Sequence, residues 1–538
     1  MEVLNIEKKL VVIGIFLMVC FASSMPVSAA SILNDNQHHI SFFNTINVDD
    51  EGDGDFLSLQ SAIDASEPNT TINVFSGIYE EGSTIQIDVD DLIIVGFSYE
   101  LGSGGDSGSP IIKGNFSGDV INISSDNVSI SGFGITNSGN DFMNLDAAIH
   151  IHSDGNLIDR NYLAGNFYAI SIHDGDNNEI SNNIIELNQM DGVFMNNSDN
   201  NTISSNTIIN NGFQGIYLND CKGNFISYNI LKINDKNGIH FFDLCSSNIV
   251  YKNTIESNSV NGVKLTTNNV GNVIIDNVIR SNGWSGIQIQ FSNSNLIKKN
   301  DINSNMYDGI LAGELSDSDG NTITENNISY NSEQGIRFGM NSNYNIVYHN
   351  NFIHNSALDY GNNTWDHDYP SGGNYWTFHS GPDSDGDGII DIPYDVAGGD
   401  NQDRYPFVEP LIPPDKPGKP SGLMFGAAGV EYSYSTSTTD GNGDKIQYGW
   451  DWDGDLRVDY WSDFYESGET CIVFHSWGEK GTYLISVIAM DIRGIESDWS
   501  EPLAVTMPKS KAINLNLFLQ RFFHCFPFFE KILNQILI

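Results

Sequence analysis

Carboxylates alternate along the segment that begins at Asp383 and ends at Asp391. Aspartates stand at its first, third, fifth and ninth positions, and a glycine stands at the sixth. Side chains at alternate positions of a tight turn converge on one point, and Ca²⁺ takes several oxygen ligands at this spacing, one of them a backbone carbonyl at the seventh position. The twelfth position, usually a bidentate Glu, is Tyr394. We expect either a plain Asp-Gly turn or, as the favoured reading, a structural calcium site formed by Asp383, Asp385, Asp387, Ile389 and Asp391.

A second segment with the same acidic spacing begins at Asp451. Leu456 stands at its sixth position, where the calcium-loop pattern has glycine. The hypothesis is a second calcium site, and the alternative is an acidic turn. Neither segment implies an open catalytic position, so both sites would be structural. The ligands of the second site would be Asp451, Asp453, Asp455 and Asp459.

Asp220 and Asp243 occupy equivalent positions in neighbouring units of a repeat that is described below. Carboxylates that stack in this way perturb each other's pKa, and glycoside hydrolysis uses two carboxylates at a defined separation. With Lys264 nearby as an electrophile, they are candidates for a polysaccharide hydrolase or lyase. The alternative, which we favour, is a solvated acidic edge. His152 and His173 are also one unit apart, and we interpret them as a surface pair rather than a metal site.

Outward-facing aromatic residues are a second candidate site. Sugar rings stack on aromatic side chains through their apolar faces, whereas scattered surface aromatics are normal in soluble proteins. The first interpretation predicts a glycan-binding platform. It would consist of Phe194, Tyr217, Trp284 and Tyr307.

Cys221 and Cys245 each lie three residues before the first Asn of a repeat unit. They should therefore stack in adjacent coils, at a separation that falls within the Cα window for a disulfide. Two stacked free thiols are an equal alternative.

The element that positions all these residues is a repeat of nine units between Asn156 and Asn355. Each unit reads Asn-x-apolar-x-x-Asn-x-apolar-x-x-Asn, followed by small-apolar-x-apolar, and its first Asn recurs every 22 to 26 residues. The apolar residues alternate with a period of two, and no stretch has the spacing of a helix. A repeat of this length is typical of stacked architectures whose units cannot bury a core alone.

The repeat predicts an all-β fold: a right-handed parallel β-helix with three short strands per coil. Stacked parallel strands lie about 4.8 Å apart, and their crossovers are right-handed. The interior should hold Ile170, Val193, Ile216, Ile239, Val263, Ile287, Ile310 and Ile336. The Asn rows should form hydrogen-bonded ladders, because an amide can bond the coils above and below it. One such row is Asn161, Asn183, Asn206, Asn229, Asn253, Asn277, Asn300, Asn326 and Asn350.

The remaining segments indicate further parts of the chain. Residues 1–30 have the charged start, apolar run and small-residue site of a signal peptide, with cleavage expected near Ala30. The β-helix should span 31–412, with an N-terminal cap at 31–66 and an Asp-, Gly- and aromatic-rich C-terminal cap at 356–412. A stiff Pro-rich linker at 413–420 should lead to an immunoglobulin-like β-sandwich at 421–508. The apolar tail at 509–538 has polar interruptions, which favour membrane-surface association over a spanning helix.

The formal net charge is -45, from 69 acidic and 24 basic residues. Phosphate binding needs concentrated Lys and Arg, so nucleic acid is not expected as a partner. The acidic composition and the predicted export signal favour a secreted or envelope-associated location. The expected partners are cell-envelope glycans or other surface proteins.

From about residue 48 to 412 the chain resembles the NosD-like family of secreted β-helix proteins, which is grouped with carbohydrate-binding and sugar-hydrolase repeats. The resemblance rests on the Asn repeats and on three runs: Val48-Asp49-Asp50-Glu51-Gly52, Gly372-Gly373-Asn374-Tyr375-Trp376 and Asp403-Arg404-Tyr405-Pro406. The founding members are linked to maturation of the copper site of nitrous-oxide reductase. Copper takes soft or imidazole ligands, and we identify no Met/His or Cys/His cluster in the sequence, so a copper cofactor is not expected.

The segment Trp450-Asp451-Trp452-Asp453-Gly454-Asp455, with Gly481-Thr482-Tyr483 and Val487, is similar to PKD-type immunoglobulin-like domains. The combined layout resembles archaeal cell-surface proteins. It implies a structural or glycan-binding surface protein stabilised by calcium. The alternative is a polysaccharide-active enzyme on the outer face of the β-helix, and a metal-maturation accessory is the third reading.

Overall fold

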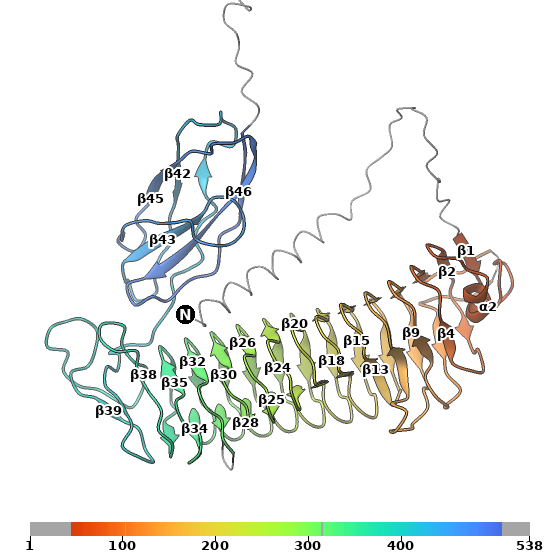
Figure 1. Ribbon diagram of the computed structural model, residues 1–538, viewed down its shortest axis with the longest axis horizontal. Coiled ribbons are helices and arrows are strands. Elements are labelled where there is room, and N and C mark those ends of the chain that lie inside the picture. The colour runs from red at the N-terminus through yellow and green to blue at the C-terminus, as the bar shows by residue number, and fades with distance from the viewer. Residues whose placement is uncertain (1–44, 103, 314–315, 508–538) are drawn as a thin grey trace, which may run out of the picture. The chain divides into compact units, whose positions relative to one another are not determined.

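The computed structural model describes residues 45–102, 104–313 and 316–507. The chain divides into two compact units that meet in sequence at Leu411 and Ile412. The first unit is a solenoid and the second is a β-sandwich (Figure 1). The predicted signal peptide, the start of the predicted N-terminal cap and the tail at 509–538 lie outside the described residues. Within the described residues, no helix has the length and apolar character needed to span a bilayer.

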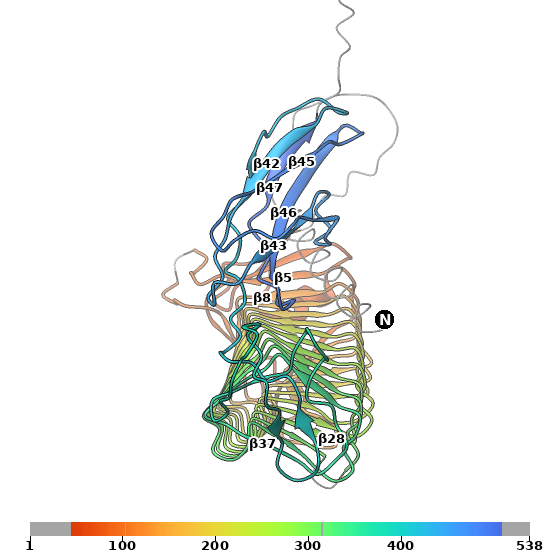
Figure 2. The ribbon, with the colours of Figure 1, turned by 90° about the vertical axis from the view of Figure 1, so that its left-hand side faces the viewer.

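The solenoid has three parallel sheets, and each coil contributes one strand to each sheet in turn, as the repeat predicts. In Figure 2, successive coils follow one another's outline closely. The first sheet contains β1 (Thr45–Val48), β2 (Thr71–Val74), β5 (Ile93–Gly96), β8 (Ser129–Ser131), β11 (Leu157–Asp159), β14 (Glu179–Ser181), β17 (Thr202–Ser204), β20 (Phe225–Ser227), β23 (Ile249–Tyr251), β26 (Val273–Ile275), β29 (Leu296–Lys298), β32 (Thr322–Thr324) and β35 (Ile346–Tyr348).

Most of the candidate site residues lie on or beside the second sheet. It contains β4 (Ile85–Ile87), β7 (Ile121–Ile123), β10 (Ala147–Ile151), β13 (Tyr168–His173), β16 (Val193–Asn196), β19 (Ile216–Asn219), β22 (Ile239–Phe241), β25 (Val263–Thr266), β28 (Ile287–Gln290), β31 (Ile310–Ala312), β34 (Ile336–Phe338) and β37 (Ala357–Asp359). The third sheet contains β3 (Ile78–Tyr79), β6 (Ile111–Lys113), β9 (Gly134–Thr136), β12 (Tyr162–Ala164), β15 (Ile184–Glu186), β18 (Thr207–Ile209), β21 (Ile230–Lys232), β24 (Thr254–Glu256), β27 (Val278–Arg280), β30 (Asp301–Asn303), β33 (Asn327–Ser329), β36 (Asn351–Ile353) and β38 (Tyr375–Trp376).

The interior row predicted from the repeat is confirmed. Each residue from Ile170 to Ile336 in that row pairs in register with its equivalent in the next coil, and all are buried. Burial of an aliphatic side chain contributes about 1.5–3 kcal/mol. A one-residue slip of any strand would turn this whole set toward solvent. The alternation of the sequence therefore fixes which residues face outward on the second sheet.

The predicted Asn ladders are also confirmed, and there are three of them. In the second ladder, the backbone N–H and the Nδ2 group of Asn206 both donate to Oδ1 of Asn229, at 2.9 and 3.0 Å. Nδ2 of Asn206 also donates to the carbonyl of Ile180 at 2.7 Å. The other ladders start at Asn156 and Asn166 and follow the same pattern. These asparagines are buried and fully bonded, so they are architectural.

Residues other than Asn and Gly also take left-handed conformations in the turns. The residue just before each Asn of the second ladder from Asn161 to Asn350 is left-handed whatever its type, as with Tyr228 (φ 55°) and Lys252 (φ 51°). Such residues cost of order 1 kcal/mol each outside glycine. The ladder bonds on either side of the turn offset this cost.

A short helix and a hairpin lie at the two ends of the solenoid. Helix α2 (Leu59–Asp64) follows the N-cap Ser58, whose hydroxyl accepts from the backbone of Ser61, and it buries its apolar face on the first coils. The hairpin, β39 (Tyr394–Asp395) and β40 (Gln402–Asp403), lies beyond the last coil. The predicted end of the repeat at Asn355 was wrong. Asn363 and Asn374 continue two of the ladders. The sequence hid this extra coil because the spacing from Asn345 to Asn363 is only 18 residues.

The second unit is an antiparallel sandwich, as predicted. One sheet contains β41 (Ser421–Gly422), β42 (Tyr432–Thr436) and β45 (Cys471–His475). The other contains β44 (Tyr460–Trp461), β43 (Ile446–Asp451), β46 (Gly481–Asp491) and β47 (Leu503–Met507). Its core includes Tyr434, Tyr448 and Trp450, all fully buried. The two sheets fit an immunoglobulin-like domain.

Candidate functional site

Aromatic side chains from four consecutive coils contact one another beside the second sheet, and we call this group the aromatic ladder: Tyr168, Phe194, Tyr217 and Phe242. Tyr168 is 1% exposed, and Tyr168 and Phe242 lie outside the register row of Phe194 and Tyr217. The ring centroids of Tyr168 and Phe194 are 5.4 Å apart, and those of Phe194 and Tyr217 are 5.3 Å apart with nearly parallel planes. Phe242 continues the stack 5.8 Å from Tyr217. Phe194 and Tyr217 pair in register on β16 and β19, because outward residues repeat once per coil. The rings of Phe194, Tyr217 and Phe242 are half-buried or exposed.

Amides flank this aromatic ladder. Nδ2 of Asn219 donates to Oδ1 of Asn196 at 2.6 Å, and both side chains lie two residues beyond the rings on the same strands. A strip of stacked aromatic rings bordered by amide donors and acceptors suits a ligand with both apolar faces and hydroxyl groups.

The other two predicted platform residues form a separate pair. Trp284 and Tyr307 stack with ring centroids 4.2 Å apart, in the turns that precede β28 and β31. The guanidinium of Arg337 lies 5.0 Å over the ring of Tyr307 and also bonds Asp308 at 2.7 Å. The four predicted aromatics therefore form two pairs and not one platform.

Asp191 lies two residues before β16, close to the start of the aromatic ladder, and is 2% exposed. Its Oδ1 accepts from the backbone N–H of Gln214 at 2.7 Å. No cation bonds it among the described residues, in contrast to Asp308 at the equivalent position of a later coil. Burial raises the pKa of Asp191 to about 8. Sequence reasoning missed this residue, since one Asp before a Gly in a repeat gives no signal of burial.

The predicted catalytic candidates do not all come together. Asp220 and Asp243 lie in adjacent coils, where the backbone N–H of Asp220 donates to the carbonyl of Asp243 at 2.8 Å. Asp220 is 3.4 Å from Lys222, and Asp243 accepts from Asn268 at 3.3 Å. Lys264 pairs in register with His240 instead, and within the described part of the chain it makes no ion pair with either aspartate. Burial lowers the pKa of Lys264.

His152 and His173 are neighbours, as predicted, with ring centroids 6.2 Å apart. The structure adds a third imidazole: His150, two residues earlier on β10, lies 4.1 Å from the ring of His152. Sequence reasoning missed it, although its spacing from His152 places both on the outer face of one strand.

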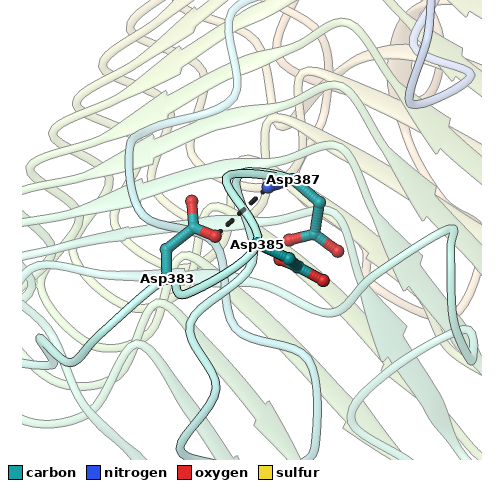
Figure 3. Close-up of side chains that lie close together, drawn as sticks. All are labelled: Asp383, Asp385 and Asp387. Carbon is teal, nitrogen blue, oxygen red and sulfur yellow. Dashed lines mark hydrogen bonds between the residues drawn. The ribbon is translucent and has the colours of Figure 1, made fainter.

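The first acidic loop brings Asp383, Asp385 and Asp387 together, with their carboxylates within 4.8 Å of one another (Figure 3). Oδ1 of Asp383 accepts from the backbone N–H groups of Gly386 and Asp387 at 2.8 and 3.1 Å. The predicted ligand Asp391 lies outside this trio, and its Oδ2 accepts from the backbone and hydroxyl of Ser384. Ile389 donates its N–H to Asp387 at 2.9 Å.

The second acidic loop brings together Asp451, Asp453 and Asp459, while Asp455 lies outside the trio. Asp451 is buried and accepts from the backbone of Gly454 and Leu456 at 2.8 and 2.9 Å. Burial raises the pKa of Asp451 to about 6. Leu456, at the position where glycine is usual, takes the left-handed conformation with φ 55°.

Cys221 and Cys245 are free, buried thiols, the second of the two alternatives. Each Sγ donates to a carbonyl two residues earlier, at 3.2 and 3.3 Å. Burial raises the pKa of both thiols.

Residues 120–279 match the family described as "Right handed beta helix region", and residues 245–381 match "Periplasmic copper-binding protein (NosD)". Over these spans the solenoid is similar to right-handed β-helix regions and to the NosD family. No curated protein matches the sequence.

Solved structures resemble each unit. The A-module of mannuronan C-5 epimerase AlgE6 from Azotobacter vinelandii is 17% identical, covers 57% of this chain and 94% of its own, and has a TM-score of 0.43. DFA-IIIase from Arthrobacter chlorophenolicus is 14% identical over 54% of this chain and 87% of its own, with a TM-score of 0.40. The PKD domain of an M14-like peptidase from a Thermoplasmatales archaeon is 44% identical over 18% of this chain and 97% of its own, with a TM-score of 0.17.

Copper, which the second family description names, takes imidazole, thiolate or thioether ligands. Within residues 245–381, no three His, Cys, Asp or Glu side chains converge among those the structure describes. His349 there bonds the carbonyl of Ser371 at 2.6 Å, and His354 stacks on Tyr330. His150, His152 and His173 are neighbours that precede the matched span, but in the structure their ring nitrogens do not all lie within 4.8 Å of one another.

Proposed function

We propose that this NosD-like β-helix is a secreted or envelope-associated surface protein that binds neutral glycans on the outer face of its second sheet. The aromatic ladder is the observation that supports this most. Its stacked rings form a contiguous apolar strip across neighbouring coils, and amides border this strip. The formal net charge of -45 disfavours anionic polymers. Neutral or N-acetylated sugars are therefore the expected class.

Removing the two central rings tests the proposal. Phe194→Ala with Tyr217→Ala should weaken binding of neutral oligosaccharides by about 10- to 100-fold, since each aromatic contact contributes about 0.5–1.5 kcal/mol beyond its buried area. Binding is screened on a panel of neutral, N-acetylated and uronic-acid oligosaccharides and then measured by calorimetry.

Tyr162→Ala with Tyr344→Ala, two exposed aromatics outside the ladder, is the matched control and should leave binding unchanged. Preferential binding of the uronic-acid oligosaccharides, or unchanged affinity in the ladder variant, would contradict the proposal.

A polysaccharide hydrolase or lyase is the second candidate, favoured by the position of Asp220 and Asp243 in adjacent coils. In that case the parent protein shortens the bound polymer, and Asp220→Asn with Asp243→Asn abolishes the shortening without changing affinity. Intact polymer after long incubation argues against this candidate.

We further infer that the acidic loops hold structural calcium and that the second unit is a PKD-type domain. Added Ca²⁺ should raise the unfolding temperature, because a ligand at 100 times its Kd stabilises the folded state by about 2.7 kcal/mol. Asp385→Asn with Asp387→Asn should remove one binding site in calorimetry. Asp235→Asn with Asp317→Asn, both exposed, makes the same charge change elsewhere and should remove none. Identical melting in Ca²⁺ and in chelator would refute the calcium assignment.

A further inference from the structure

Three consecutive coils of the second sheet have buried polar atoms without hydrogen-bond partners on the outer face. They are Oδ1 of Asn122 on β7, Nε2 of His150 on β10 and Oγ of Ser171 on β13. The three residues are paired in register, so these atoms form one row. An unpaired buried polar atom costs about 1–3 kcal/mol. Three in a row, outside the turns and ladders that the fold requires, indicate that something else satisfies them.

His150 has the arrangement of a metal ligand. Its Nδ1 lies 3.2 Å from Oδ2 of Asp119, and the residue is 5% exposed. When Nδ1–H donates to a carboxylate, the imidazole is fixed in the tautomer that leaves a lone pair on Nε2. Histidines that bind metals almost always donate their other ring N–H to a carboxylate, carbonyl or water in this way.

Two further imidazoles border this lone pair. His152 follows on the same face of β10, with its ring 4.1 Å from that of His150. His173 is the next ring, 6.2 Å from His152 and one coil further on. His152 is exposed and the side chain of His173 is 37% exposed. In the structure the three sets of ring nitrogens do not all lie within 4.8 Å of one another, so shared binding requires His152 and His173 to turn toward Nε2 of His150, and His173 to leave Asp174 and Asn196.

We propose that His150, His152 and His173 bind a divalent late-transition-metal ion of the Zn²⁺ and Cu²⁺ class, with Asp119 orienting His150. Neutral imidazole suits these ions, whereas the carboxylates of the acidic loops suit Ca²⁺. The two kinds of site therefore discriminate between hard and borderline cations. The site is independent of the glycan-binding proposal, since none of its residues belongs to the aromatic ladder.

Calorimetric titration of Zn²⁺ into the untagged full chain, with excess Ca²⁺ to occupy the acidic loops, tests the site. One Zn²⁺ should bind, and His152→Gln, which changes an exposed side chain, should weaken it at least about tenfold. Asp119→Asn keeps a hydrogen-bond acceptor beside His150 and should weaken binding about 10- to 100-fold. Cu²⁺ should displace Zn²⁺, because it binds the same ligands more tightly.

The exposed His354 provides the matched control, and His354→Gln should bind Zn²⁺ like the parent. His150→Gln should abolish the site, and the unfolding temperature in chelator shows whether that variant is folded. Parent-like affinity in His152→Gln and in Asp119→Asn, or an equal loss in His354→Gln, would overturn the proposal.

Discussion

Replacing Trp376 by alanine is expected to lower the free energy of unfolding of the solenoid by about 3–5 kcal/mol, the usual cost of removing a buried aromatic side chain. The indole stacks between Phe352 and Tyr394, each with its ring centroid 4.0 Å away. Its Nε1 donates to Oδ2 of Asp403 at 2.8 Å. The substitution would both open the end of the core and remove a donor from a buried carboxyl. Denaturant unfolding followed by circular dichroism measures the loss.

Trp284→Ala is the control, because that indole is 40% exposed, and it should cost much less than Trp376→Ala. Trp376→Phe retains part of the stack but not the hydrogen bond, so its free energy of unfolding should lie between those of the parent and the alanine variant. A loss below about 1 kcal/mol for Trp376→Ala would mean that the last coil does not close the core.

Asp191→Asn is expected to stabilise the protein increasingly as the pH rises from about 4 to about 8. The pKa of Asp191 is raised from 3.8 to about 8 in the folded state. Between these values the folded state binds a proton that the unfolded state has lost, so the stability of the parent falls as the pH increases. Each pKa unit corresponds to about 1.4 kcal/mol, so the advantage of the variant reaches several kcal/mol above pH 8.

An Asn is expected to fit at position 191, because Asn237 and Asn261 stand at the equivalent position in later coils. Oδ1 of each accepts a hydrogen bond from the backbone N–H of the next coil, as Oδ1 of Asp191 does. Asp308→Asn is the contrasting variant. It removes the partner of Arg337 and should destabilise the protein at neutral pH. Unfolding curves from pH 5 to pH 9 measure both variants. A difference between Asp191→Asn and the parent that stays constant over this range would show that the carboxyl titrates normally.

The solenoid could be predicted from the sequence because its determinants are local and repeated. A period-two apolar strand and an Asn at the turn recur in every coil, so the facing row and the ladders follow from spacing alone. The last coil was missed where the spacing shortened between Asn345 and Asn363. For the sandwich the sequence predicted only the range 421–508. Strand β45 has no clear alternation, because its outward residues Ile472 and Phe474 are as apolar as its buried ones.

The candidate sites were only partly predictable for a related reason. The acidic trios lie in single tight turns, where sequence spacing and distance agree. The aromatic ladder and the imidazoles depend on which residues of different coils contact one another. Phe194 with Tyr217 followed from the repeat. Tyr168 and Phe242 reach these rings from other register positions, and His150 lies beside His152 in the coil before His173, so contacts in space were needed to place them. The burial of Asp191 depends on its neighbours in space, and no pattern along one chain reveals it.

The three Asn ladders have one direction along the solenoid. In each of them the backbone N–H of an Asn donates to Oδ1 of its equivalent one coil nearer the C-terminus, so each Oδ1 faces back toward the N-terminal coil. The final coil has no further Asn to accept from its donors. Instead, the backbone N–H of Asn374 donates to Oδ2 of Asp403, and Nδ2 of Asn363 donates to Oδ1 of Asp359. An ionised carboxylate accepts hydrogen bonds and never donates them. It can therefore satisfy the N–H groups of the last coil without leaving a donor of its own unpaired. A shortened or lengthened version of this protein would need carboxylates to accept hydrogen bonds from its last coil. It would also need backbone N–H donors before its first coil.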